Sequence, residues 1–345
     1  MMLRNSVHEP AKAAETPAWL VPNRRLRLLR AGMRILGAIR PALAGRVMDR
    51  LWFSAPRSTP RVTERAILDT GEPLSFDVHG RSVAAWTWGN EGPTVLLLHG
   101  WGGNAGQMHA FVAPLRRAGF RVIAFDAPAH GASAPSRLGG RRVTFFEFAE
   151  ALQIVASGEP ALAGIIAHSG GCTAVALALR QGWTAPAMMV FVSPFARPAA
   201  AIDDFARAIG ANRQVTAAFR AGVERWFQRP WSYLDVSTLA DSHKWRRLLV
   251  VHDEEDREVP LSHACAVADS WPSAQLMVTR GLGHRRPLRD ADVVERVLAF
   301  LADGPGASSA EAGGYLPRDS RSGLDAAYEA LVSDGAGTFA PRRGC

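Results

Sequence analysis

The sequence predicts an α/β protein in which a central, mostly parallel sheet carries helices on both faces and a small helical cap. From Thr94 onward, apolar runs alternate with helix-like stretches, as successive βαβ units would produce. The apolar runs are almost continuous, which is typical of strands buried on both faces. Residues 194–245 form a longer segment than a simple crossover needs, and this segment predicts the cap.

The 345 residues leave room for one large α/β domain with modest additions. Composition divides the chain into four regions. We expect a disordered tail over 1–20, a basic amphipathic arm with a linker over 21–62, the α/β domain over 63–302, and a flexible tail over 303–345 with a short helix at 324–331.

The arm carries most of the positive charge. Eight arginines against Asp49 alone account for +7 of the chain's formal net charge of +8. Its apolar residues recur at helical spacing, and Pro41 should divide it into two helices. Such an arm can dock on its own domain or lie on an anionic membrane surface. Docking is favoured because amphipathic helices of soluble proteins usually bury their apolar face against their own domain. Nucleic-acid binding is not expected, because the arm has few aromatic residues and no recognised module follows it. The apolar positions are Leu26, Leu29, Met33, Leu36, Leu43 and Val47.

Within the α/β domain, Arg65–Asp69 and Arg81–Trp88 are expected as short strands at an antiparallel edge of the sheet. Later strands should occupy the apolar runs that begin at Thr94, Val122 and Ile165 and those that span Met188–Val192, Leu248–His252 and Leu276–Val278. Helices are expected at Ala105–Ala118, Thr144–Ala156 and Thr173–Gln181.

Ser169 lies where an apolar run turns through small residues into a helix-like segment. A sharp strand-to-helix turn strains the backbone around its central residue, so the positions two before and two after it must carry almost no side chain. Ala167 and Gly171 meet that requirement. The Gly170 N–H would then lie at the first turn of the helix, where a backbone donor and the helix dipole can meet a developing oxyanion. The alternative is chance, since the chain is rich in Ala and Gly.

An activated serine needs a histidine base and a carboxylate, and both follow Ser169 at the ends of later apolar runs. The run Leu248–His252 opens into an acidic segment, and Leu276–Val278 opens into Gly281-Leu282-Gly283-His284. Three other carboxylates compete with Asp256 for the role of the acid, and the register relative to Val259-Pro260 favours Asp256. The competitors are Asp253, Glu254 and Glu255.

Over roughly Glu64–Leu301 the chain resembles the α/β-hydrolase superfamily. TVLLLHGWGG from Thr94 is similar to the third strand and oxyanion turn of that superfamily, and VIAFDAPAHGAS from Val122 is similar to its D-x-P-G-H-G-x-S segment. VVHDEEDREVP is similar to the acid loop. Two residues depart from the family pattern: Ala129 and Asp253 stand where Gly is usual.

The resemblance implies Ser169 as the nucleophile, His284 as the general base and Asp256 as the acid that holds the imidazole. It implies backbone N–H groups of Trp101 and Gly170 as the oxyanion hole. His284 could instead be a surface histidine before Arg285 and Arg286, but its place after a late strand favours catalysis. Three further histidines within the motifs are expected to bond backbone turns around the site, and Cys172 is expected to be a buried small hydrophobe. The histidines are His99, His130 and His168.

We therefore expect a serine hydrolase that acts on an ester or related acyl substrate with an apolar portion. An acyltransferase or thioesterase with the same triad, and a non-catalytic ligand-binding relative, are the alternatives. A serine at the elbow disfavours the relatives that use a carboxylate nucleophile. Some of the cap's aromatic residues should line the substrate pocket, while most should pack the cap onto the core. These apolar cap residues are Phe195, Ile202, Phe205, Phe219, Trp226, Phe227, Trp231 and Tyr233.

No cofactor or metal is expected. The chain lacks a Walker-type loop, a dinucleotide fingerprint and an HExxH pair, and its three cysteines show no metal-ligand spacing. The first residues do not read as an export signal, so a cytoplasmic location is expected.

Overall fold

The computed structural model describes residues 24–56, 58–159, 161–239 and 246–304. The expectations for the tail over 1–20, and for the C-terminal tail from 305 onward with its helix at 324–331, lie outside the described residues.

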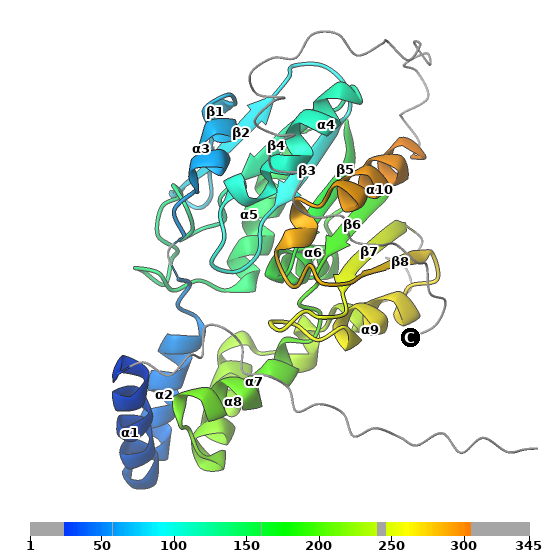
Figure 1. Ribbon diagram of the computed structural model, residues 1–345. Coiled ribbons are helices and arrows are strands. Elements are labelled where there is room, and N and C mark those ends of the chain that lie inside the picture. The colour runs from blue at the N-terminus through cyan, green and yellow to red at the C-terminus, as the bar shows by residue number, and fades with distance from the viewer. Residues whose placement is uncertain (1–23, 57, 160, 240–245, 305–345) are drawn as a thin grey trace, which may run out of the picture.

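Eight strands form one sheet in the order β1-β2-β4-β3-β5-β6-β7-β8 (Figure 1). The first two strands pair antiparallel with each other, and β2 pairs antiparallel with β4, whereas the pairs from β4 to β8 are parallel. The predicted fold class is therefore confirmed. The strands are β1 (Glu72–Asp77), β2 (Ser82–Trp88), β3 (Thr94–Leu98), β4 (Arg121–Phe125), β5 (Leu162–His168), β6 (Met188–Val192), β7 (Arg247–Asp253) and β8 (Ala274–Thr279).

Helices cover both faces of the sheet, and the side chains of the central strands are buried throughout. One apolar core lies under α4 and α10, and a second lies under α5, α6 and α9. Side chains cap the N-termini of two of these helices. Thr144 accepts a hydrogen bond from the Glu147 amide at the start of α5, and Asp290 accepts one from the Val293 amide at the start of α10. The helices are α4 (Val112–Arg117), α5 (Phe145–Ser157), α6 (Gly170–Arg180), α9 (Ser262–Ser270) and α10 (Ala291–Ala302).

The expected strand at Arg65–Asp69 was wrong, because residues Val62–Leu68 form helix α3. Glu64 accepts a hydrogen bond from the Arg61 amide at 2.9 Å, which satisfies one donor at the helix start. Glu64 and Leu68 are both buried, and their spacing of four places them on one helical face. The first edge strand is instead β1, a mostly exposed strand after the turn that ends α3.

The N-terminal helices α1 (Arg24–Ile39) and α2 (Pro41–Trp52) form a hairpin, broken at Pro41 as expected. The hairpin packs on the cap helices α7 (Ala201–Ile209) and α8 (Arg213–Phe227), and the four helices lie together beside the sheet domain (Figure 1). Glycine allows α2 and α8 to pack closely: a Cβ at Gly45 would lie 3.3 Å from the Phe219 amide nitrogen, tighter than an ordinary van der Waals contact.

Aromatic rings fasten the end of α2 to the cap. The Trp52 ring lies 5.1 Å from Phe205, 5.8 Å from Phe219 and 6.0 Å from Trp231, measured between centroids. Phe53 lies 5.5 Å from the ring of Trp226. Such pairs add about 0.5–1.5 kcal/mol each beyond the burial of their surface. The hairpin and the cap thus form one packed unit.

Candidate active site

Ser169 lies at the sharp turn between β5 and α6, with φ of 51° and ψ of −117°. A non-glycine residue in this region is strained, and the surroundings must hold it there. Three hydrogen bonds do so. The Ser169 amide donates to the Val192 carbonyl at 3.0 Å, and the Ser169 carbonyl accepts from the amides of Cys172 at 3.0 Å and Phe195 at 3.2 Å. A Cβ at Gly171 would lie 2.7 Å from the His99 carbonyl, so the small residue there is required.

The turn after β3, which contains Gly100 and Trp101, also lies close to Ser169. A Cβ added at Gly100 would lie 2.9 Å from Ser169 Cβ, and one added at Gly170 would lie 3.4 Å from the Trp101 amide nitrogen. The Trp101 and Gly170 amides therefore lie near each other beside the serine. Gly170 is the first residue of α6, where backbone N–H groups have no partner within the helix.

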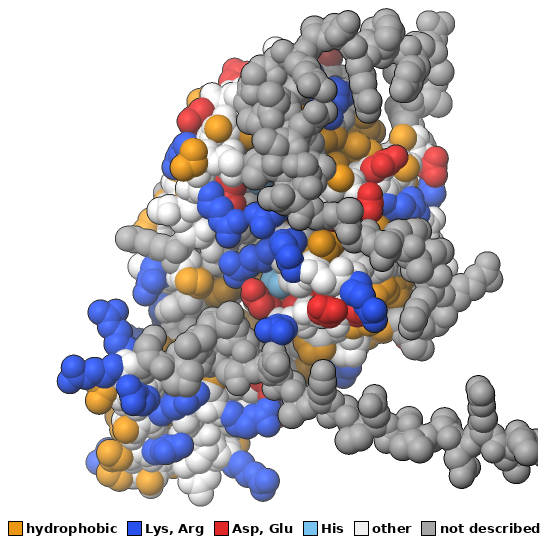
Figure 2. All heavy atoms as spheres, in the orientation of Figure 1, with side chains coloured by type: hydrophobic (Ala, Val, Ile, Leu, Met, Phe, Trp, Pro, Cys, Tyr) orange, Lys and Arg blue, Asp and Glu red, His pale blue; other side chains and the backbone are white. Residues whose placement is uncertain are grey.

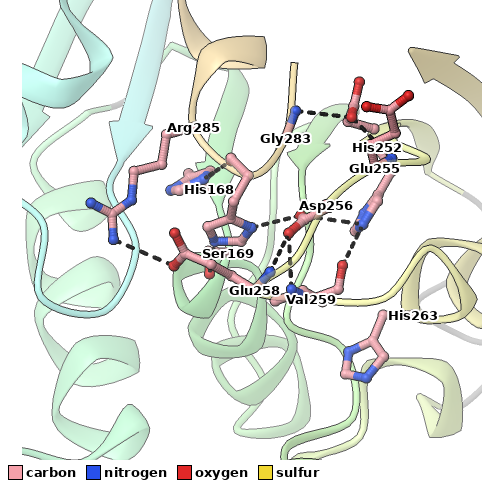
Figure 3. Close-up of polar contacts among 12 residues, drawn as sticks. His168, Ser169, His252, Glu255, Asp256, Glu258, Val259, His263, Gly283 and Arg285 are labelled. Atoms are coloured by element: carbon pink, nitrogen blue, oxygen red, sulfur yellow. Dashed lines mark hydrogen bonds and ion pairs between the residues drawn. The ribbon is translucent and has the colours of Figure 1, made fainter. Parts of the chain in front are cut away.

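His284 connects Ser169 to Asp256. His284 Nε2 lies 3.0 Å from Ser169 Oγ, and its Nδ1 lies 2.7 Å from Asp256 Oδ2. A carboxylate only accepts, so Nδ1 carries the proton and Nε2 is left to accept from the serine hydroxyl. All three side chains are buried or nearly so, and they follow the ends of β5, β7 and β8 in the chain. Figure 3 shows Ser169 and Asp256 with the contacts around them.

Asp256 is held as an anion. Burial raises the pKa of its carboxyl, but the hydrogen bond and charge of His284, together with the Val259 amide and His252, bring the net pKa below the ordinary value. Its Oδ1 accepts from the amides of Glu258 at 2.8 Å and Val259 at 2.9 Å. His252 Nε2 bonds the Val259 carbonyl at 3.0 Å and lies 3.4 Å from Asp256 Oδ2 (Figure 3).

Asp253 is fully buried and organises the loop that carries His284. Its Oδ1 accepts from the Gly283 amide at 2.9 Å, and its Oδ2 accepts from the Leu282 amide at 2.9 Å and the Thr279 hydroxyl at 2.8 Å. Oδ1 also accepts from the Glu255 amide at 3.0 Å within the acid loop. Of the carboxylates that compete in the sequence, Asp256 therefore contacts His284, while Asp253 ties the acid loop to the histidine loop. Sequence patterns gave no signal for this second role.

The other histidines of the sequence motifs bond backbone groups around the site. His99 Nε2 accepts from the Ala127 amide at 3.0 Å, and His130 Nε2 accepts from the Gly102 amide at 2.9 Å, which fixes the turn that carries Trp101. His168 Nε2 bonds the His284 carbonyl at 3.0 Å.

These rings are neutral. Burial, followed by the charge of His284, lowers the pKa of His168 to about 3. Burial is also the largest cause that lowers the pKa of His99 to about 3 and that of His130 to about 4. Cys172 is buried on the helix side of the elbow, and burial raises the pKa of its thiol.

A cavity of about 360 Å³ opens onto Ser169, and its lining is mainly apolar. Of the cap's aromatic residues, Phe195 and Phe205 line it, whereas Phe219 and Trp231 pack against Trp52. One wall comes from the end of the N-terminal hairpin, which the sequence did not predict. The apolar lining residues are Leu51, Trp52, Phe53, Pro56, Trp101, Phe145, Phe195, Phe205 and Val259, and the polar ones include Gln107, Glu258 and Arg285.

None of the helices in the described part of the chain combines the length and apolarity needed to cross a membrane.

Residues 95–297 match the model of the "Alpha/beta hydrolase family". Est1E from Butyrivibrio proteoclasticus, solved with ferulic acid bound, is similar at a TM-score of 0.52 and 20% identity, over 67% of this chain and 98% of that chain. The Pyrococcus furiosus esterase PF2001 is similar at a TM-score of 0.53 and 21% identity, over 72% of this chain and 96% of that chain. At such identities the likeness is one of fold. No curated protein sequence matches the chain.

Proposed function

The chain belongs to the α/β-hydrolase family, and on that premise we propose that it is a serine hydrolase that cleaves an ester or related acyl bond through an acyl-enzyme intermediate. The unbroken hydrogen-bonded series from Ser169 through His284 to Asp256, opening onto an apolar cavity, carries this proposal.

In the first step, Ser169 Oγ attacks the carbonyl carbon of the substrate while His284 Nε2 takes the hydroxyl proton. Asp256 stabilises the resulting imidazolium, and it is anionic at neutral pH because its pKa lies below the ordinary value. The Trp101 and Gly170 amides donate to the carbonyl oxygen as it becomes negative, and one such donor is worth about 2.7–4 kcal/mol in comparable sites.

The tetrahedral intermediate collapses when His284 returns the proton to the leaving alcohol, which leaves the acyl group on Ser169. Water then attacks the acyl-enzyme, with His284 as its base, and releases the acid. The apolar lining favours a substrate with an apolar portion, and the volume of about 360 Å³ fits a small molecule.

A fluorophosphonate probe followed by intact-mass measurement tests the activated serine. We expect one adduct on the wild-type protein, none on Ser169→Ala, and slow labelling of His284→Ala and Asp256→Asn. Ser193→Ala is the matched control, because Ser193 is also buried and also has a positive φ, of 49°. It should label like the wild type.

Absence of an adduct on folded wild-type protein, even with small reactive esters, would contradict the proposal and favour a non-catalytic ligand-binding role. Partition of a preformed acyl-enzyme between water and an added alcohol or thiol then separates hydrolase from acyltransferase. Dominant transfer to the added acceptor would assign the acyltransferase chemistry.

A further inference from the structure

The N-terminal hairpin presents a second apolar stripe on its outer side. Leu28, Ile35 and Ile39 of α1 have 64%, 63% and 70% of their surface exposed, and Leu43 of α2 has 48%. The spacings of seven and four residues place the three α1 side chains on one line along the helix. We call these four residues the outer stripe. Scattered single apolar residues on a surface need no explanation, but an aligned set does.

The outer stripe is not the face that docks on the cap. The docked side of α1 buries Met33 and Gly37, which lie on the opposite side of the helix, and a Cβ at Gly37 would lie 2.9 Å from Val215 Cγ2. Asn212 Nδ2 also donates to the Gly37 carbonyl at 3.3 Å. The contact of the hairpin with its own domain therefore leaves the outer stripe uncovered by the cap.

Positive charge surrounds the outer stripe. From Arg24 to Met48 the chain carries seven arginines and no acidic residue. Arg30 donates through Nε to the Ala208 carbonyl at 2.6 Å, and the other six arginines of this segment are exposed. In Figure 2, hydrophobic side chains gather over α1 and α2 at the lower left, with Lys and Arg side chains around them. The next acid along the chain, Asp49, is already paired with Arg142 at 2.8 Å.

We propose that the outer face of the α1–α2 hairpin binds an anionic lipid surface, with the outer stripe inserted among the acyl chains and the arginines on the headgroups. Exposed apolar residues on one line, flanked by cations and free of acids, are what an interfacial helix requires. This role is independent of the chemistry proposed for Ser169.

Two other occupants fit the surface less well. A second copy of the chain would bring the same arginine-rich face against itself across a two-fold axis, with like charges opposed. A nucleic acid would satisfy the arginines but would offer nothing to Leu28, Ile35 and Ile39. A lipid surface satisfies both the apolar and the charged parts.

Vesicle flotation of the full chain tests the proposal, with phosphatidylcholine vesicles that contain or lack phosphatidylglycerol. We expect binding only when phosphatidylglycerol is present, and weaker binding at high salt. The double variant I35S/I39S keeps the charge but loses two apolar side chains of the outer stripe. Its affinity for the vesicles should fall by at least roughly tenfold. The variant R34Q/R40Q should lose about fivefold for each arginine.

Matched controls use the same changes elsewhere. V62S removes a valine that is 88% exposed outside the outer stripe, and R117Q/R289Q removes two exposed arginines of the sheet domain. Both should float like the wild type, and the melting temperature checks that every variant is folded. Absence of wild-type flotation, or equal flotation of I35S/I39S and the wild type, would overturn the proposal. A dimer in light scattering that I35S/I39S abolishes, or oligonucleotide binding without vesicle binding, would overturn it in favour of those partners.

Discussion

The amide of Gly283 donates to the carboxylate of Asp253 at 2.9 Å, so the loop that carries His284 is fastened to the end of β7. The same carboxylate accepts from Glu255 in the loop that carries Asp256. The proposed base and the proposed acid therefore share one buried anchor. A misplacement of about 1 Å in a catalytic group can cost on the order of 10²-fold in rate.

Replacing Asp253 with Asn should lower kcat for a reference ester on the order of 10²-fold. An amide nitrogen at this position would face a backbone donor where a carboxylate oxygen now accepts, so the His284 loop should shift. The rate of fluorophosphonate labelling should fall in parallel, while KM changes little. Glu254→Gln is the matched control, since Glu254 is exposed and pairs with Arg280. A labelling rate for Asp253→Asn within twofold of that control would contradict the anchoring role.

Asp256→Asn should lower kcat on the order of 10⁴-fold, as the corresponding change does in a serine protease triad. The Asn side chain would no longer fix the proton on His284 Nδ1, so Nε2 would lose its role as acceptor. Steady-state kinetics at saturating ester measures this, with Glu255→Gln as the control. Comparable losses in the two variants would mean that Asp256 does not act as the acid.

Trp52→Leu should shift acyl preference toward longer or bulkier chains. Trp52 lines the cavity and belongs to the hairpin, so a smaller side chain enlarges the cavity from that wall. Values of kcat/KM over a series of esters of increasing chain length would reveal the shift. Trp226→Leu is the control, because Trp226 packs on Phe53 and Phe227 but does not line the cavity. An unchanged chain-length optimum in Trp52→Leu would show that this wall does not contact the acyl group.

Stability should fall as the pH is lowered from about 6.5 toward 4. Burial lowers the pKa of His99 and His168 to about 3 and that of His130 and His263 to about 4, so the unfolded chain takes up these protons first. The resulting stability is complete above the unfolded pKa and is lost as the pH approaches the folded values.

Asp126 opposes this trend, because burial raises its pKa to about 6 and the folded state gains a proton as the pH falls toward 3.8. Burial also lowers the pKa of His109 and His252 and raises that of Asp49, Asp235 and Asp290. Among the described residues, six histidines with a lowered pKa against four carboxyls with a raised pKa give a net loss of stability. Melting temperatures at constant ionic strength measure the slope, and His130→Gln should reduce it. A melting temperature that rises on acidification would contradict the assignment of neutral buried rings.

The fold could be predicted because its strongest signals are local. The apolar runs of β3, β5, β6 and β7 are unbroken, and each ends at a turn of recognisable chemistry. The antiparallel edge of the sheet was harder to predict from the sequence. Residues 65–69 fit a strand by composition, but the burial of Glu64 and Leu68 on one face makes them helical.

The candidate site was predictable where sequence order is informative and not where distant segments meet. Ser169, Asp256 and His284 follow one another in a recognisable order, and the structure brings them within hydrogen-bonding distance. The role of Asp253 depends on amides of a loop about thirty residues later, which spacing does not reveal. The periodicity of α1 predicted its docked face, whereas the outer stripe stands out only once the docked face is known.

Residues 51–56 form one wall of the cavity beside Ser169, so differences in this segment should change which substrates related proteins accept. The family match covers residues 95–297, so the part of the cavity wall that contains Trp52 lies outside the matched residues. Two enzymes with the same nucleophile, base and acid but different N-terminal hairpins should therefore differ in substrate range. Exchanging such hairpins offers a modular route to new acyl preferences that leaves the reacting groups in place.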